Sequence, residues 1–323
     1  MKRAPCLLSL TALALAFAGC GKSEPGGPAA GGKTRVALVY KATTNPFFQA
    51  MEKGAVEKAR ELGADLEAAG VEAETDVDRQ ADLVRNMVNR GVGAMIIAPA
   101  SSVGIVTPLL RAQQANIPII NIDNRINKEE AARQGLKVAT FIGPDNFDGA
   151  KKVAAYGAGL IKKKMAAGGK GGVLILRGID GVENADARRA GFEAALKEAG
   201  LPIAGSESAH WHTEEAQQVT AALLAATPEV LGIFCANDKM ALGAIAAVKA
   251  RGKTGQIVII GYDNIDLARD AMKRGEMDAT VEQNPALMGA LGVECALKAL
   301  KGETLPEVTP VPVQLITAED VKK

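Results

Sequence analysis

The chain has 323 residues, a formal net charge of +1 at pH 7 and only 3% aromatic residues. With 38 basic against 37 acidic residues it has no basic excess to neutralise a phosphate backbone, which excludes nucleic-acid binding as the expected function. Its four cysteines do not form a disulfide framework, and Cys235 and Cys295 lie in apolar stretches where buried thiols are expected.

Residues 1–20 predict an export signal, because a basic start precedes an apolar run over residues 7–17 and small residues before Cys20. Two processing routes compete. AFA at 16–18 fits an ordinary cleavage site, whereas FAGC resembles a lipoprotein signal in which Cys20 is acylated. The lipoprotein reading is favoured, since residues 21–33 form a flexible Gly/Pro/Ala tether. We therefore expect the periplasm or cell envelope, with a lipid anchor on Cys20.

After the tether, apolar β-branched segments alternate with amphipathic ones. A strand over 35–40 precedes a helix over 46–63, a strand over 93–99 precedes a helix over 102–115, and a further strand covers 117–123. Continuous apolar strands that alternate with helices predict a parallel sheet covered by helices on both faces. The expected fold class is therefore α/β.

The second half of the chain repeats this order. A strand over 171–178 with its helix over 185–200, and then strands over 231–238 and 257–264, correspond to the elements of the first half. Two copies of one β/α unit imply two similar Rossmann-like lobes. Ligands of open parallel sheets bind beyond the carboxyl ends of the strands, so a cleft between the lobes is the expected site.

The loops after these strands carry amide, carboxylate and guanidinium groups, which bind vicinal hydroxyls by donating and accepting in pairs. They are Lys41, Thr43, Asn45, Ser101, Ser102, Asp123, Asn124, Arg125, Asn184, Arg188, Asn237, Asp238, Lys239, Asp263 and Asn264. Any one Asn or Asp fits a helix cap equally well, Asn237 included. A cap does not explain Arg188, a cation within the first turns of a helix, or the aromatic pair that follows Pro46.

The aromatic residues predict the apolar walls of this cleft. Phe47 and Phe48 occupy successive helical positions about 100° apart, so one ring should face the core while the other, or the edges of both, faces the cleft. The flat apolar face of a sugar ring suits such a partner. Trp211, the only tryptophan, either closes on the opposite face of the ligand or anchors its loop to the core.

Two further motifs are interpreted as structural. His210 and His212 form an H-x-H pair without another histidine in the chain, which favours solvent exposure over a metal site. The Gly-rich run over 166–172 precedes a strand and lacks the ending of a phosphate loop, so a turn is expected. Neither a nucleophile elbow, nor a dinucleotide fingerprint, nor a clear carboxylate pair occurs. The sequence therefore predicts a binding protein without a cofactor and not an enzyme.

Seven segments in register resemble one family over nearly the whole chain after the tether. They are NPFF, APASSV, IPIINIDNR, ARRAGFEAAL, FCANDKMALGA, IIGYDN and ATVEQNPALMGA. In order they are similar to the periplasmic ribose-binding and allose-binding proteins of bacterial sugar ABC transporters. The resemblance implies a type I periplasmic binding fold, a monosaccharide held between lobes that close about a hinge, and a membrane permease as partner.

The resemblance and the loop chemistry together give the expected ligand-binding residues. They are Lys41, Asn45, Phe47, Phe48, Asp123, Asn124, Asn184, Arg188, Trp211, Asn237, Asp263 and Gln283. Lys41 and Trp211 resemble the allose-binding branch. Ribose-binding proteins have an arginine at the position of Asn124 and an asparagine at that of Ala98, so an allose-like hexose is the expected ligand.

The family's crossing pattern implies a first lobe of residues 34–143 plus 284–312 and a second lobe of 144–283 plus 313–323. A monomer is expected, with a chemoreceptor as a further candidate partner. Three alternatives remain open. They are a sensor subunit that reports to a membrane receptor or kinase, a sugar-responsive repressor core, and an enzyme that acts on the sugar. The repressor needs a helix-turn-helix where this chain has its export signal.

Overall fold

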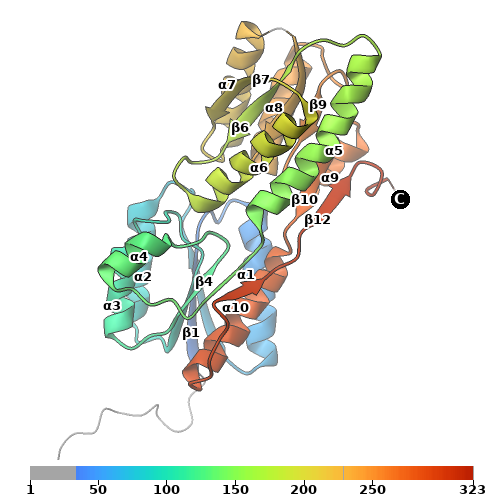
Figure 1. Ribbon diagram of the computed structural model, residues 1–323. Helices are drawn as coiled ribbons and strands as arrows, with labels where there is room; N and C mark the ends of the chain where they lie inside the picture. Colours follow the sequence, from blue (N-terminus) through green and yellow to red (C-terminus); the bar gives the residue numbers. More distant parts are fainter. Residues whose placement is uncertain (1–33, 228, 323) are drawn as a thin grey trace, which may run out of the picture. The chain divides into compact units, whose positions relative to one another are not determined.

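Two six-stranded sheets, one in each lobe, organise the computed structural model, which describes residues 34–227 and 229–322 (Figure 1). The strand order of the first lobe is β11-β5-β4-β3-β1-β2. Its strands are β1 (Arg35–Tyr40), β2 (Asp65–Gly70), β3 (Ala94–Ile97), β4 (Ile119–Ile122), β5 (Thr140–Gly143) and β11 (Val308–Pro310). Its helices are α1 (Pro46–Glu61), α2 (Val77–Asn89), α3 (Val106–Gln114), α4 (Lys128–Gln134) and α10 (Pro285–Leu300).

The strand order of the second lobe is β12-β10-β9-β8-β6-β7. Its strands are β6 (Gly172–Arg177), β7 (Ile203–Ser208), β8 (Val230–Cys235), β9 (Val258–Ile260), β10 (Ala279–Glu282) and β12 (Gln314–Thr317). Its helices are α5 (Asn146–Ala166), α6 (Glu183–Ala199), α7 (Thr213–Ala226), α8 (Asp238–Ala250) and α9 (Asp266–Lys273).

The two sheets repeat one topology. From β2 the first sheet continues with β1, β3, β4, β5 and β11, and from β7 the second continues with β6, β8, β9, β10 and β12. All neighbouring strands pair in parallel except β10 and β12, which are antiparallel. The predicted α/β fold with two similar lobes and an internal repeat is therefore confirmed.

Helices cover both faces of the first sheet, as the apolar strand pattern predicted. Along β1, Val36 and Leu38 belong to one buried cluster, whereas Ala37 and Val39 belong to the cluster on the opposite face. All four side chains are fully buried. A strand enclosed in this way contributes about 1.5–3 kcal/mol for each large aliphatic side chain that leaves water, which explains why it is apolar at every position.

Three short segments connect the lobes, at residues 144–145, 283–284 and 311–313. After the second crossing, α10 returns to the first lobe and packs against α1. Glycines allow this close approach, because a Cβ at Gly54 would lie 2.1 Å from the carbonyl oxygen of Ala286, and one at Gly289 would lie 2.0 Å from that of Met51. Short connections between firmly packed lobes suit a hinge, in which few residues change their backbone angles.

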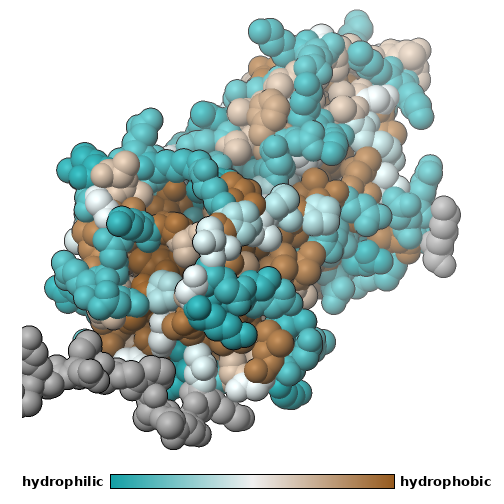
Figure 2. All heavy atoms as spheres, turned by 60° about the horizontal axis from the view of Figure 1, so that its bottom comes forward, coloured by the Kyte–Doolittle hydropathy of each residue, from teal (hydrophilic) through white to brown (hydrophobic). Residues whose placement is uncertain are grey.

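The end of the first lobe that lies farthest from the second lobe has both apolar and hydrophilic surface (Figure 2). Figure 2 views this end and shows apolar surface, in brown, among hydrophilic side chains in teal. A hollow near the connection between α3 and β4 is lined by Ile117, Pro118 and Leu300, and among the described residues Lys137 is its only ionisable lining residue. The charged residues that the sequence predicts for ligand binding therefore do not line this hollow.

Residues 1–33, including Cys20, lie outside the described part of the chain, so the export signal and the tether stay predictions. Within the described part, no helix combines the length and the apolar character that crossing a membrane requires.

Asp238 begins α8 as a fully buried carboxylate. Its Oδ1 accepts a hydrogen bond from the Thr280 hydroxyl at 2.7 Å, and its Oδ2 accepts one from the Ile265 amide at 3.0 Å. Burial nevertheless raises the pKa of Asp238 to about 6, although these hydrogen bonds oppose the shift. Because the unfolded carboxyl ionises at lower pH than the folded one, the stability it contributes is present near pH 4 and is lost as pH rises through 6.

We predict that Asp238→Asn removes this pH dependence. The free energy of unfolding of the wild type, minus that of the variant, should fall by up to about 3 kcal/mol between pH 4 and pH 7. Urea titrations of both proteins at a series of pH values measure this difference. A difference that stays constant over this range would show that Asp238 titrates with an ordinary pKa.

Candidate ligand-binding site

A small cavity lies between the two lobes. It is lined by Lys41, Asn45, Phe47, Phe48, Glu74, Asp123, Asn184, Arg188, Trp211, Asn237, Asp263 and Gln283. These residues follow the carboxyl ends of the strands, as expected for parallel sheets.

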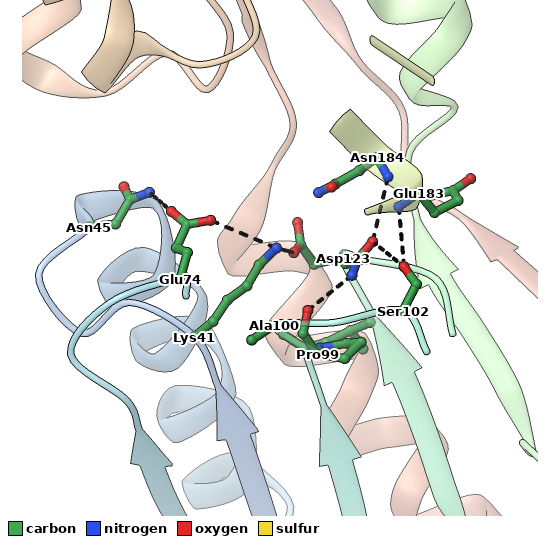
Figure 3. Close-up of polar contacts among 12 residues, drawn as sticks. Lys41, Asn45, Glu74, Pro99, Ala100, Ser102, Asp123, Glu183 and Asn184 are labelled. Atoms are coloured by element: carbon green, nitrogen blue, oxygen red, sulfur yellow. Dashed lines mark hydrogen bonds and ion pairs between the residues drawn. The ribbon is translucent and has the colours of Figure 1, made fainter. Parts of the chain in front are cut away.

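The first lobe contributes a buried ionic cluster. The Nζ of Lys41 lies 3.5 Å from Oδ2 of Asp123 and 3.8 Å from Oε2 of Glu74 (Figure 3). The side-chain amide of Asn45 donates to the other oxygen of Glu74 at 3.2 Å. All four residues are at most 5% exposed. Charges this deeply buried need partners, and here the pairing also orients them along one wall of the cavity.

The aromatic pair lies on the same side. The rings of Phe47 and Phe48 meet edge to face with their centroids 5.0 Å apart, and the Phe48 ring stacks on Tyr40 at 6.3 Å. Both rings belong to the core of the first lobe and both line the cavity. Of the two arrangements expected from the sequence, the structure has both rings at the cavity.

Arg188 organises the second lobe's side of the cavity. Its guanidinium donates to Oδ1 of Asn146 at 2.8 Å, to the carbonyl of Ala236 at 2.8 Å and to Oε1 of Gln283 at 3.1 Å. It also lies 3.6 Å from Oδ1 of Asp263, which accepts a hydrogen bond from the Gln283 amide at 2.5 Å. These contacts hold the guanidinium in one orientation.

Two aromatic rings flank this guanidinium. Its carbon lies 4.0 Å from the centroid of the Tyr262 ring and 5.7 Å from that of Trp211. Both rings are buried, and burial raises the pKa of the Tyr262 hydroxyl. Cation–π contacts are strongest where water is excluded, as in this place. Trp211 is therefore part of the cavity wall as well as of the second lobe's core.

Asp123 and Asp263 occupy corresponding positions in the two lobes, in the loops that follow β4 and β9. Both have a positive φ, of 62° and 121°. Both backbone amides bond to the next strand, to Ile142 and to Val281. Such angles cost free energy in a non-glycine residue and cluster at ligand sites. Burial raises the pKa of Asp263 well above its usual range, and the nearby Arg188 partly offsets this.

Several buried polar atoms of the cavity have no hydrogen-bond partner among the described residues. They are Oδ2 of Asp123, Oδ1 of Asn184 and Nε1 of Trp211. A buried polar atom without a partner is costly, so most are satisfied in folded proteins. Two acceptors and one donor in a cavity of this size are positioned to bind a small polar molecule.

Asn45 and Asn237 have two roles at once. Each is the N-cap of a helix, since Asn45 accepts from the amide of Phe47 and Asn237 from that of Met240. Each also lines the cavity. The sequence left capping and exposure to the cavity open as two interpretations, and both apply to these residues. The reason is that a helix that follows a strand starts at the ligand edge of the sheet.

Two placements differ from the expected set. Asn124 is fully buried outside the cavity lining and donates to the carbonyl of Pro99 at 3.0 Å. Glu74 lines the cavity although sequence reasoning passed over it, because the acidic loop before α2 resembles a solvated connection. Asn146, which orients Arg188, was also missed. Its position at the start of α5, beside a crossing segment, was the only signal that could have identified it.

The remaining motifs have structural surroundings. His210 is exposed and its Nδ1 lies 2.8 Å from Glu215, whereas His212 is half-buried. The described residues contain no group of His, Cys, Asp and Glu that could hold a metal ion. The run over 166–172 turns the chain between α5 and β6, with Gly168 and Gly171 at positive φ.

Trp211 packs against Gly178, where a Cβ would lie 2.1 Å from Cζ2 of the indole. We predict that Gly178→Ala displaces this ring towards water and shifts its fluorescence emission to longer wavelength. Because Trp211 is the only tryptophan of the chain, the emission spectrum reports on this position alone. Gly159→Ala is the matched control, since a Cβ there meets nothing within 4 Å. Identical spectra for the two variants would contradict this packing.

Comparisons with known proteins identify the family. The sequence model of the periplasmic binding protein domain matches residues 36–304. The D-ribose/D-allose-binding protein of Pseudomonas aeruginosa is 38% identical, with 88% of this chain and 89% of that protein covered. The D-allose-binding periplasmic protein of Escherichia coli is 36% identical, with 84% and 86% covered.

Solved structures agree. A periplasmic solute-binding protein of an ABC transporter from Actinobacillus succinogenes, with bound D-allose, superposes with a TM-score of 0.83 at 37% identity and covers 90% of this chain and 99% of its own. These relatives are binding proteins of transporters and not enzymes, which confirms the prediction of a binding protein and lends no support to a sensor. The chain belongs to the periplasmic sugar-binding proteins of ABC transporters, in the ribose- and allose-binding family.

Proposed function

We propose that the protein binds a neutral hexose, preferably an allose-like one, in the cavity between its lobes and presents it to a membrane permease. The observation that carries this proposal is a small cavity with aromatic walls, lined by buried polar atoms that make no hydrogen bond to the described residues. A sugar matches both features, because its hydroxyls donate and accept while its ring faces are apolar.

The charges of the cavity favour a neutral ligand. Among the described residues, its lining has two cations, Lys41 and Arg188, and three acidic side chains, Glu74, Asp123 and Asp263. Each cation already lies within 4 Å of a carboxylate. A sugar acid or sugar phosphate would therefore find both cations already paired and would face the carboxylates of Glu74 and Asp123, whereas hydroxyl groups can donate to carboxylate oxygens at little electrostatic cost.

We assign the roles by position. Phe47 and Phe48 stack on one face of the sugar and Trp211 on the other. Asp123, Asp263 and Glu74 accept hydrogen bonds from hydroxyls, whereas Lys41, Arg188, Asn237 and Gln283 donate to them. Asn184 accepts through its unpartnered Oδ1. A sugar that lacks one of the matching hydroxyls leaves a buried group unpaired, and this penalty gives specificity.

The choice of an allose-like hexose rests on the relatives. Two relatives that cover most of the chain are named for allose, and one solved neighbour holds D-allose.

Lobe boundaries at 143/144, 283/284 and 312/313 fit the three connecting segments, about which the lobes close on the sugar. We propose that the protein acts as a monomer.

We predict that D-allose raises the melting temperature of the protein, since a ligand at 100 times its dissociation constant adds about 2.7 kcal/mol of stability. Arg188→Ala should weaken binding at least about 100-fold, because it removes a buried charge and leaves Asp263 unpaired. Calorimetry with allose, ribose, galactose, xylose and inositol measures both effects. Arg188→Lys, which keeps the charge but loses the planar fork, should be intermediate.

Arg189→Ala is the matched control, since the neighbouring arginine is 37% exposed and lies 3.8 Å from Asp186 on the surface of α6. It should bind allose like the wild type. If no neutral monosaccharide changes the melting temperature, the proposed ligand class is wrong. If a sugar other than allose binds most tightly, the ligand class stands and the preference for allose does not.

We also propose that the protein is anchored to a membrane by a lipid on Cys20. The argument is the small-residue signal before this cysteine and the tether after it. Cys20→Ser should abolish incorporation of labelled fatty acid in cells and release the protein from the membrane fraction. Cys6→Ser is the control and should leave both unchanged. Fatty-acid labelling that persists in Cys20→Ser would contradict the anchor.

A further inference from the structure

Helix α6 begins without a cap of its own. Its N-cap residue is Val182, which has an extended backbone (φ −91°, ψ 124°) and makes no capping hydrogen bond through its side chain. The first amide groups of a helix have no partner within the helix and need one from elsewhere. A helix that starts at valine therefore depends on its surroundings to satisfy the amides of Glu183 and Asn184.

Two side chains of the first lobe supply these partners across the cleft. The amide of Glu183 donates to Oγ of Ser102 at 3.1 Å, and the amide of Asn184 donates to Oδ1 of Asn124 at 3.5 Å (Figure 3). Ser102 lies in the loop that follows β3 and Asn124 in the loop that follows β4, so both bonds run from the first lobe to the start of α6. One lobe thus caps a helix of the other.

The two capping side chains are held in place by their own lobe. The Ser102 hydroxyl donates to Oδ1 of Asn124 at 3.3 Å, and Nδ2 of Asn124 donates to the carbonyl of Pro99 at 3.0 Å. The side chain of Asn121 donates to the backbone carbonyl of Asn124 at 2.8 Å. This network turns Oδ1 of Asn124 towards α6. The two acceptors are therefore oriented before the second lobe arrives.

The capped turn also carries part of the sugar site. Asn184 lies in it and Arg188 lies one turn further along α6, and both line the cavity. Ser102 and Asn124 themselves do not line it. We propose that Ser102 and Asn124 are positioning residues, which cap α6 across the cleft and so set the affinity for every ligand without selecting among ligands.

The physical reason is a population shift. When the lobes separate, the amides of Glu183 and Asn184 lose their acceptors, so the cap stabilises only the closed arrangement. An apparent dissociation constant equals the intrinsic one divided by the fraction of molecules in the competent state. Loss of the cap lowers that fraction equally for all ligands. Its effect on sugar binding rests on the proposed function, whereas its effect on closure does not.

The first test compares two adjacent serines. Ser102→Ala should weaken the binding of allose, and of any second sugar that binds, by the same factor of about 5, as for the loss of one helix cap. Ser101→Ala is the matched control, because Oγ of Ser101 accepts from the amide of Gly104 within its own loop. It should bind both sugars like the wild type. A loss in Ser102→Ala that differs among sugars would overturn the proposal.

The second test removes the donor instead of the acceptor. Proline is tolerated at the first position of a helix and favours an extended residue before it, which is the conformation of Val182. Glu183→Pro therefore deletes the amide hydrogen while the helix can still start, and Glu183→Ala retains it. Glu183→Pro should bind at least about 5-fold more weakly than Glu183→Ala, because the bond is lost and the ring Cδ takes the place of the hydrogen that points at Oγ of Ser102. In the Ser102→Ala background this difference should become smaller, since the same bond is already absent and alanine leaves more room for the ring.

Hydrogen exchange separates this proposal from the proposed function. In the allose complex, the amide hydrogens of Glu183 and Asn184 should exchange faster in Ser102→Ala than in the wild type, as measured by NMR. If no sugar binds to the wild type, the proposed function is wrong. The cap is then tested only by comparing amide exchange in the free wild type and in free Ser102→Ala. Faster exchange at both amides would then support the cap. Equal exchange, or equal affinity of Ser102→Ala and the wild type, would overturn it.

Discussion

The buried guanidinium of Arg188 is the group on which the rest of the site depends. A charge with 3% exposure is tolerated only when it is paired and hydrogen-bonded. Its partners come from four places in the chain, namely Asn146 at the start of α5, Ala236 after β8, Asp263 after β9 and Gln283 in a crossing segment. Satisfying this one side chain therefore fixes the strand-end loops of the second lobe relative to one another.

This arrangement also connects the site to the hinge. Asn146 adjoins one of the three segments that join the lobes, Gln283 lies in another, and both bond directly to Arg188. A rotation of the lobes that moves either residue changes the surroundings of the guanidinium. The ligand wall and the hinge thus share hydrogen bonds, which is a physical basis for coupling between binding and closure.

The internal repeat explains why neither lobe is sufficient alone. Corresponding loops of the two lobes place Asp123 and Asp263 at the ends of β4 and β9, and each aspartate lies beside one cation of its own lobe. Duplication of one unit provides the same polar strand edge twice. The aromatic surroundings differ, because Phe47 and Phe48 follow β1 whereas Trp211 follows β7. Similar halves with different apolar walls can enclose a ligand whose two faces are not equivalent.

Much of the candidate site followed from local patterns. In a parallel sheet every strand ends at the same edge, so polar residues within a few positions of the ends of apolar strands, such as Lys41, Asn237 and Asp263, are brought together whatever the details of packing. The α/β class and the repeat followed from the alternation of apolar and amphipathic segments. Glu74 escaped this reasoning because its role comes from its contacts with Lys41 and Asn45, more than 25 residues away in the chain.

Asn124 shows most clearly the limit of what the sequence predicts about the site. Strand pattern and family resemblance placed it in the cleft beside Asp123, and the backbone does bring both to the same loop. The left-handed conformation of Asp123 and the hydrogen bond to Pro99 direct the Asn124 side chain away from the cavity and towards α6. The sequence by itself determined which residues reach the ligand edge of each sheet, because strand periodicity is local. Only the tertiary structure decided which of them face the cavity and which face the other lobe, because that choice depends on contacts between segments far apart in the chain.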